Sequence, residues 1–136
     1  MSNKSIYQQQ AELNEEIAAA AQLGFPEWAI IMYFYAALHW INDYAYRNGE
    51  MEELKKNADE SQHKTRREYI KKVAKRKKRR ELEECYKTLF SDSIIARYLE
   101  DEQGGCINST ARQYYSKCNI KDYIDCLETI KKILAS

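Results

Sequence analysis

The sequence predicts a single all-α domain, residues 1–136, built around one strongly apolar central helix. Its 136 residues match the commonest domain size, which is large enough to bury a core. It contains only four glycines and one proline, whereas a sandwich or barrel of short strands needs turn residues at short intervals. Apolar residues recur every three or four positions, which places them on one face of a helix. These observations favour helices joined by short connections.

Two helices are predicted in the first third of the chain. The first covers residues 5–23, where apolar residues recur at helical spacing between polar ones, and it ends at Gly24. The second covers residues 26–47 and begins with Pro26, whose missing N–H costs nothing in the first turn of a helix. It is apolar on nearly every side, so other helices must cover it. Asn48 and Gly49 predict its left-handed C-terminal cap.

The rest of the chain predicts three further helices. Residues 50–60 are polar and are expected to form a connector or a short helical turn, after which Ser61 caps a helix that carries His63 and Tyr69. Apolar spacing then predicts helices over residues 82–98 and 120–134. Between them, residues 101–110 contain two adjacent glycines and predict a loop.

A basic segment at residues 71–80, KKVAKRKKRR, concentrates the positive charge. It holds eight of the 22 basic residues, so the remaining chain has 14 basic and 21 acidic residues. On a helix these cations cover every face, so we expect the segment to escape burial and to project into solvent or onto a partner. Clustered cations neutralise phosphates, which predicts nucleic-acid binding by Lys71, Lys72, Lys75, Arg76, Lys77, Lys78, Arg79 and Arg80. The alternative is a solvated arm that links two helices.

Targeting and redox signals point to a cytoplasmic protein. The longest apolar stretch, Trp28 to Leu38, is well short of the ~20 residues that a membrane-spanning helix needs. The N-terminal residues are polar and lack the apolar core of a secretory signal. The four cysteines form no C-x-x-C pair, so free thiols are expected rather than a zinc site or a disulfide framework.

Three stretches resemble the HEPN family of small prokaryotic helical domains over about residues 26–98. The resemblance rests on Trp28, Tyr35 and His39 in the central helix, on His63 and Arg66, and on Ser93, Ala96, Arg97 and Tyr98. It implies an up-and-down bundle of four to five helices that is commonly a homodimer. It also implies a place in defence or toxin–antitoxin systems, and many members are metal-independent ribonucleases.

The ribonuclease signature of that family is an arginine followed after four to six residues by a histidine. This chain has no arginine at that distance before His63 or His39, and Lys56 occupies such a position, with six residues between it and His63. Lysine supplies a charge but not the planar fork with which arginine binds a phosphate.

Candidate catalytic residues are His63, Arg66 and Arg67, with Lys56 and His39 as alternatives. On a helix the two arginines lie three and four positions from His63 and share its face, so an acid–base group and phosphate clamps would meet there. The alternative for His63 is a surface histidine at the start of a charged helix. For His39 the alternative is a core histidine that donates a hydrogen bond to a backbone carbonyl or a tyrosine.

Metal and cofactor binding are not expected. Glu60 and His63 have the spacing of a di-iron bundle ligand pair, but the chain has only two histidines and no second Glu-x-x-His.

Taken together, the basic segment and the incomplete ribonuclease signature favour a module that binds RNA, a protein partner or both without catalysis. The alternatives are a metal-independent endoribonuclease that leaves 2′,3′-cyclic phosphate ends and a helical adaptor that binds only proteins.

Overall fold

The computed structural model describes residues 3–55 and 62–136. The helices are α1 (Ile6–Ala21), α2 (Pro26–Arg47), α3 (Gln62–Lys77), α4 (Glu81–Tyr98), α5 (Ala111–Tyr115) and α6 (Ile120–Ala135), with a 3₁₀ turn η1 (Met51–Leu54). The described ranges contain no strand, so the predicted all-α class is confirmed. The predicted number of four to five helices is wrong, because these residues form six.

The additional helix is α5, which lies between the helices predicted over residues 82–98 and 120–134. Its N-terminus has a capping box, in which the Thr110 hydroxyl accepts from the Gln113 amide and the Gln113 side chain accepts from the Thr110 amide. This S/T-x-x-E/Q pattern was present in the sequence as a helix-start signal. The Tyr115 side chain of α5 is buried, and its hydroxyl donates to the Asp92 carbonyl of α4 at 3.0 Å.

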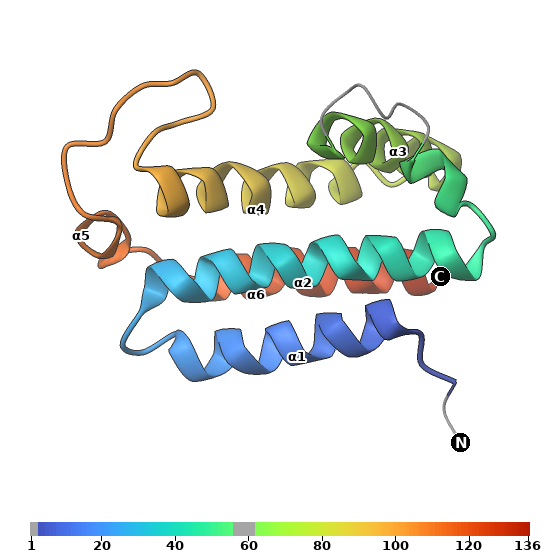
Figure 1. The fold of residues 1–136 in the computed structure, drawn as a ribbon, viewed down its shortest axis with the longest axis horizontal. Helices are drawn as coiled ribbons and strands as arrows, with labels where there is room; N and C mark the ends of the chain where they lie inside the picture. The colour runs from blue at the N-terminus through green and yellow to red at the C-terminus, as the bar shows by residue number, and fades with distance from the viewer. Residues whose placement is uncertain (1–2, 56–61) are drawn as a thin grey trace.

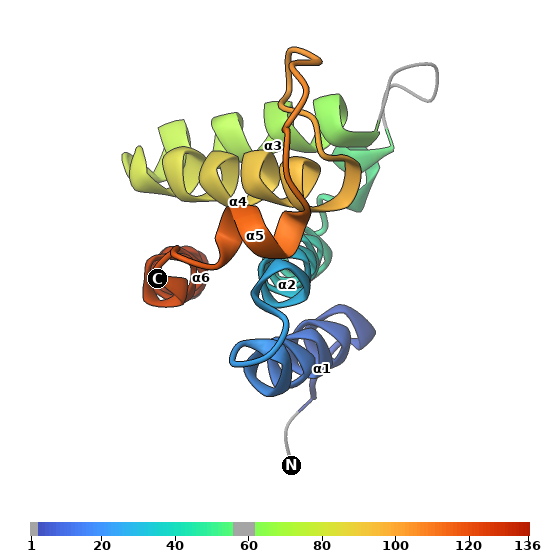
Figure 2. The same cartoon turned by 90° about the vertical axis from the view of Figure 1, so that its left-hand side faces the viewer.

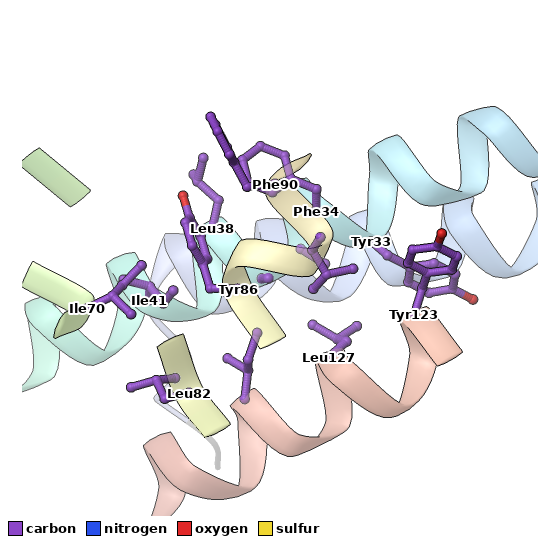
Figure 3. Close-up of a cluster of buried hydrophobic side chains, with 14 of the residues drawn as sticks. Tyr33, Phe34, Leu38, Ile41, Ile70, Leu82, Tyr86, Phe90, Tyr123 and Leu127 are labelled. Atoms are coloured by element: carbon purple, nitrogen blue, oxygen red, sulfur yellow. The ribbon is translucent and has the colours of Figure 1, made fainter. Parts of the chain in front are cut away.

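Helix α2 lies at the centre of the bundle, as its composition predicts (Figure 1). It packs against α1 on one side and against α4 and α6 on the others, while α3 lies alongside α4 and η1 (Figures 1 and 2). The core side chains come mainly from α2, α4 and α6 (Figure 3). Phe34 of α2 contacts Tyr86 and Phe90 of α4, with ring centroids 5.7 Å apart in both pairs.

The C-terminus of α2 has the cap that the sequence predicts. Gly49 has a φ of +67°, in the left-handed region that favours glycine. The Gly49 amide donates to the Tyr46 carbonyl and the Glu50 amide donates to the Ala45 carbonyl at 2.7 Å, which together form a Schellman motif. This cap turns the chain into η1, in the stretch where a connector or a short helical turn is predicted; the predicted Ser61 cap lies outside the described residues.

Helix α3 ends with the same motif but without a glycine. Lys78 has a φ of +57°, its amide donates to the Lys75 carbonyl, and the Arg79 amide donates to the Ala74 carbonyl at 2.9 Å. The chain reverses there and α4 begins at Glu81. The basic segment is therefore the last turns of α3 followed by a tight connection to α4.

Candidate nucleic-acid interface

The basic segment is divided between two sides of α3. Val73 and Ala74 are buried, so the prediction that the whole segment escapes burial is wrong for these two residues. The two apolar positions give α3 a packing face, because they lie one turn beyond the buried Tyr69 and Ile70. The cations occupy the flanks of this face and its opposite side.

Three of the predicted nucleic-acid ligands have partners on other segments of the protein, and a fourth, Arg79, pairs with the nearby Glu81 at 3.0 Å. Arg76 forms an ion pair with Glu50, and Lys72 forms one with Glu53 at 3.2 Å. The Lys77 ammonium donates to the Ser136 carbonyl at 2.6 Å. These cations join α3 to the segment after α2 and to the end of α6, so they stabilise the fold.

The outward side of α3 carries a row of five exposed cations, which we call the α3 ridge: Lys64, Arg67, Lys71, Lys75 and Lys78. The spacing of three and four residues places the first four one above another on one face of α3, and Lys78 follows directly after the end of the helix. No ion pair joins Arg67, Lys71, Lys75 or Lys78 to another residue in the described ranges. Their charge is therefore available to an anionic partner. Two of these residues, Lys64 and Arg67, precede the basic segment.

A groove of about 320 Å³ runs between α3 and α4, beside the ridge. We call it the α3–α4 groove, and its lining residues are Arg67, Ile70, Arg80, Glu83, Glu84, Tyr86, Lys87 and Phe90. Ile70, Tyr86 and Phe90 are buried and form its apolar floor, while the three cations and two carboxylates stand at its edge. The sequence did not predict Lys87 as a site residue, or the groove itself, because both depend on how α4 packs against α3.

The predicted catalytic residues do not share one surface. Arg66 is buried at 9% exposure, whereas Arg67 is exposed and belongs to the α3 ridge. His63 is half-buried, with its ring centroid 4.8 Å from that of Phe90, so it is not the surface histidine of the alternative interpretation. Of the two arginines, Arg66 therefore lies on the buried side of α3 and Arg67 on the side that is open to solvent.

The structure instead brings Arg66 close to both histidines. Burial lowers the pKa of His63 below its usual range, and the nearby Arg66 and Arg97 cations lower it further. Burial and the charge of Arg66 likewise lower the pKa of His39. The His63 Nδ1 and the Arg66 Nε are buried, and neither has a hydrogen-bond partner among the residues that the structure describes.

His39 is half-buried on α2, and its Nδ1 lies 3.4 Å from the Asn42 amide nitrogen. The predicted backbone or tyrosine partner is not found in the described ranges; the neighbour is this asparagine. Asp43, one turn later, faces away from His39, because it accepts from Ser5 at 2.6 Å and pairs with Arg47 at 2.8 Å. Among the described residues, no carboxylate is hydrogen-bonded to the His39 ring.

Arg97 is a further charged residue near His63 that was not among the candidate site residues. Its Nη1 donates to the Tyr35 hydroxyl at 3.0 Å, and its Nε donates to the Ser93 carbonyl at 3.2 Å. The guanidinium also lies 5.8 Å from the ring centroid of Phe34. The sequence signal was Ser93 four residues before Arg97, which indicates a shared helix face but not its neighbours on α2.

The remaining predictions concern metals and membranes. Lys56 and Glu60 lie outside the described residues. Within residues 3–55 and 62–136 no group of three or more His, Cys, Asp or Glu side chains is placed to hold a metal ion. None of the helices formed by these residues has the length and apolar character to cross a bilayer.

The geometry therefore presents an exposed row of cations, a groove beside it and a half-buried pair of histidines around one buried arginine. No protein-family model, curated protein or solved structure matches this chain. The resemblance to HEPN domains thus stays a prediction from the residues quoted above. Any functional conclusion depends on the surface itself.

Proposed function

We propose that this protein is an RNA-binding module that contacts the phosphate backbone through the α3 ridge and acts without catalysis. The observation that carries the proposal is the ridge itself, in which Arg67, Lys71, Lys75 and Lys78 have no acidic partner among the described residues. From Lys64 to Lys75 the helical part of the ridge is about 16 Å long at 1.5 Å per residue, and Lys78 follows at the end of α3. A continuous row of this length suits several successive phosphates.

The chain's overall charge supports a local interface. The formal net charge is only +1, so the protein as a whole has little general attraction for polyanions. RNA binding would therefore be restricted to the face of the protein that carries the ridge. Together with the HEPN resemblance, this favours an up-and-down, HEPN-like helical module of a prokaryotic defence or toxin–antitoxin system.

The test is the salt dependence of RNA binding, measured by fluorescence anisotropy with a labelled single-stranded RNA. Each phosphate contact contributes about 0.7 to the slope of log affinity against log salt for a single strand. Lys71→Gln/Lys75→Gln should therefore weaken binding and reduce the slope by about 1.4. The charge-matched control is Lys117→Gln/Lys121→Gln, which removes two exposed lysines near the start of α6. Equal slopes for both double variants would refute the proposal.

A metal-independent endoribonuclease is the second candidate. It is favoured by the half-buried His63, whose lowered pKa keeps the imidazole neutral and able to accept a proton from a 2′-OH at neutral pH. Arg66 and Arg97 beside it are suited to stabilise negative charge. The test is incubation with mixed RNA in EDTA. If this candidate is correct, the wild type produces 2′,3′-cyclic phosphate ends and His63→Ala does not. Binding of the RNA without cleavage favours the binding module.

The proposal also includes a contact with a protein partner or with a second copy of the chain. Helix α1 lies at the edge of the bundle and exposes Ile6, Leu13 and Ile17 by 72, 52 and 51%. These residues face away from the core at helical spacing, which suits a helix-to-helix contact. Sedimentation equilibrium of the wild type and of Leu13→Glu tests the homodimer. A wild-type protein that is monomeric at all concentrations would rule out the homodimer.

A further inference from the structure

Tyr86 belongs to the cluster of buried side chains in Figure 3, and it also lines the α3–α4 groove. Its side chain is 2% exposed, and no described residue makes a hydrogen bond of normal geometry with its hydroxyl. Burial raises the pKa of this hydroxyl, and the buried Arg66 lies close enough to lower that pKa, although less strongly. Buried hydroxyls in proteins nearly always have a partner, since an unpartnered one loses its hydrogen bonds to water. The hydroxyl therefore has hydrogen-bonding capacity that Arg66 does not use with normal geometry, and a polar atom of a ligand in the groove would use it.

The rest of the groove adds two chemically different parts. Ile70 and Phe90 continue the floor as an apolar surface, suited to one face of a flat ring. Arg67, Arg80 and Lys87 at the edge are suited to a phosphate, and a guanidinium plane also stacks on a base. The volume of about 320 Å³ lies at the lower end of the range for small-molecule sites, which fits one nucleotide.

Two carboxylates determine which way such a ligand is oriented. Glu83 and Glu84 line the same groove and repel phosphate oxygens, but they accept hydrogen bonds from the N–H groups of a base. The base edge is therefore favoured near the carboxylates and the phosphate near the cations. An anion alone would leave the apolar floor and both carboxylates unused.

We propose that the α3–α4 groove binds one unpaired nucleotide of a single-stranded RNA, with its base on the floor against Tyr86. The phosphate lies on Arg80 and Lys87, and the strand continues along the α3 ridge through Arg67. This inference rests on the proposed RNA binding and adds selectivity to it. The bases of a duplex are paired and stacked, so they do not enter the groove, whereas an unpaired base gains stacking and a hydrogen bond.

The experiment compares a labelled ten-nucleotide RNA with its blunt duplex, and adds adenosine monophosphate as a probe of the groove alone. The single strand should bind about tenfold more tightly than the duplex, in line with one stacked base. Adenosine monophosphate should shift the amide NMR signals of residues 83–90. Tyr86→Phe should lower the affinity for the single strand about fivefold, which corresponds to the loss of one hydrogen bond, and should leave the affinity for the duplex unchanged.

The variants separate this inference from the proposed function. Arg80→Gln/Lys87→Gln should remove the shifts caused by adenosine monophosphate, whereas Lys71→Gln/Lys75→Gln should retain them. Suppose that Lys71→Gln/Lys75→Gln lowers RNA affinity, but the single strand and the duplex bind equally well and Tyr86→Phe has no effect on binding. The groove inference is then overturned and the RNA proposal stands. No binding of either RNA overturns both. NMR shifts in the groove with an acidic peptide but none with the nucleotide would overturn the inference in favour of a protein ligand.

Discussion

Arg76 and Glu50 form a bidentate ion pair, in which Nη1 donates to Oε2 at 2.9 Å and Nη2 donates to Oε1 at 3.0 Å. The same carboxylate accepts from the Tyr69 hydroxyl at 2.8 Å, and Arg76 also donates to the Tyr44 hydroxyl at 3.0 Å. The pair links α3 to the end of α2. Arg76 is therefore occupied within the fold, although its position in a basic decapeptide predicts nucleic-acid binding.

Glu50→Gln should lower the free energy of unfolding at pH 7 by about 1 kcal/mol, a modest value because Arg76 is 42% exposed. The hydrogen bond from Arg76 lowers the pKa of Glu50 from 4.5 to about 2. Its folded pKa is below its unfolded pKa, so the contribution is present above pH 4.5 and is lost as the pH falls toward 2. Urea unfolding at pH 7 and pH 3 measures this difference.

The control for that prediction is Glu52→Gln, which changes an exposed carboxylate without an ion pair to any of the described residues. It should leave the free energy of unfolding nearly unchanged at both pH values. If Glu50→Gln and Glu52→Gln behaved alike, the bidentate pair would contribute nothing to stability.

Arg66→Gln should raise the pKa of both His39 and His63, since its cation lowers both. Both values should remain below 6.5, because burial is the larger cause of each shift. Titration of the histidine ring protons by NMR measures the two values separately in the folded protein. Arg97→Gln is the matched control: it should raise the pKa of His63 and leave that of His39 in place.

The lowered pKa values also set a pH dependence of stability. Each histidine binds a proton more weakly in the folded state than in the unfolded state. The unfolded chain therefore binds more protons below pH 6.5, and the free energy of unfolding falls as the pH drops below that value. His63→Gln should reduce this fall between pH 7 and pH 5 in urea unfolding; an unchanged slope would contradict the shift.

Helix α2 and its cap could be predicted because each depends on local sequence. Apolar residues on every side require a central position, and the Asn48-Gly49 pair supplies the left-handed residue that ends a helix. The end of α3 could not be predicted in this way. Its left-handed residue is Lys78, which has no such preference, and tertiary packing of α3 on α4 selects that conformation.

The candidate site was predictable only in part for a similar reason. Clustered cations in the sequence indicate an anionic partner, but the packing of α3 decides which of them are paired with carboxylates of the protein itself. Lys72 and Arg76 are paired with carboxylates from residues 50–53, a contact between segments about 20 residues apart. Tyr86 joins the basic surface only because α4 runs back along α3. Sequence spacing does not determine which helices pack together.

Tyr86→Phe should leave the free energy of unfolding within about 0.5 kcal/mol of the wild type or raise it, since the lost hydroxyl is buried without a hydrogen bond of normal geometry. Tyr115→Phe is the matched control, because the Tyr115 hydroxyl donates to the Asp92 carboxylate at 2.8 Å. That change should cost about 1.5 kcal/mol. Urea unfolding of the two variants gives the comparison, and a larger loss for Tyr86→Phe would show that its hydroxyl has an internal partner.

Lys78→Gly should raise the free energy of unfolding by about 0.5 to 1 kcal/mol, because glycine adopts a φ of +57° without the strain that a lysine side chain creates. The same change at Lys71, inside α3, should lower it by about 1 kcal/mol, since glycine is a poor helix former. Both variants remove one cation of the α3 ridge, so charge loss does not distinguish them. If the changes in the free energy of unfolding of the two variants have opposite signs in urea unfolding, the difference comes from the backbone conformation. A destabilised Lys78→Gly protein would mean that the lysine is not strained at the end of α3.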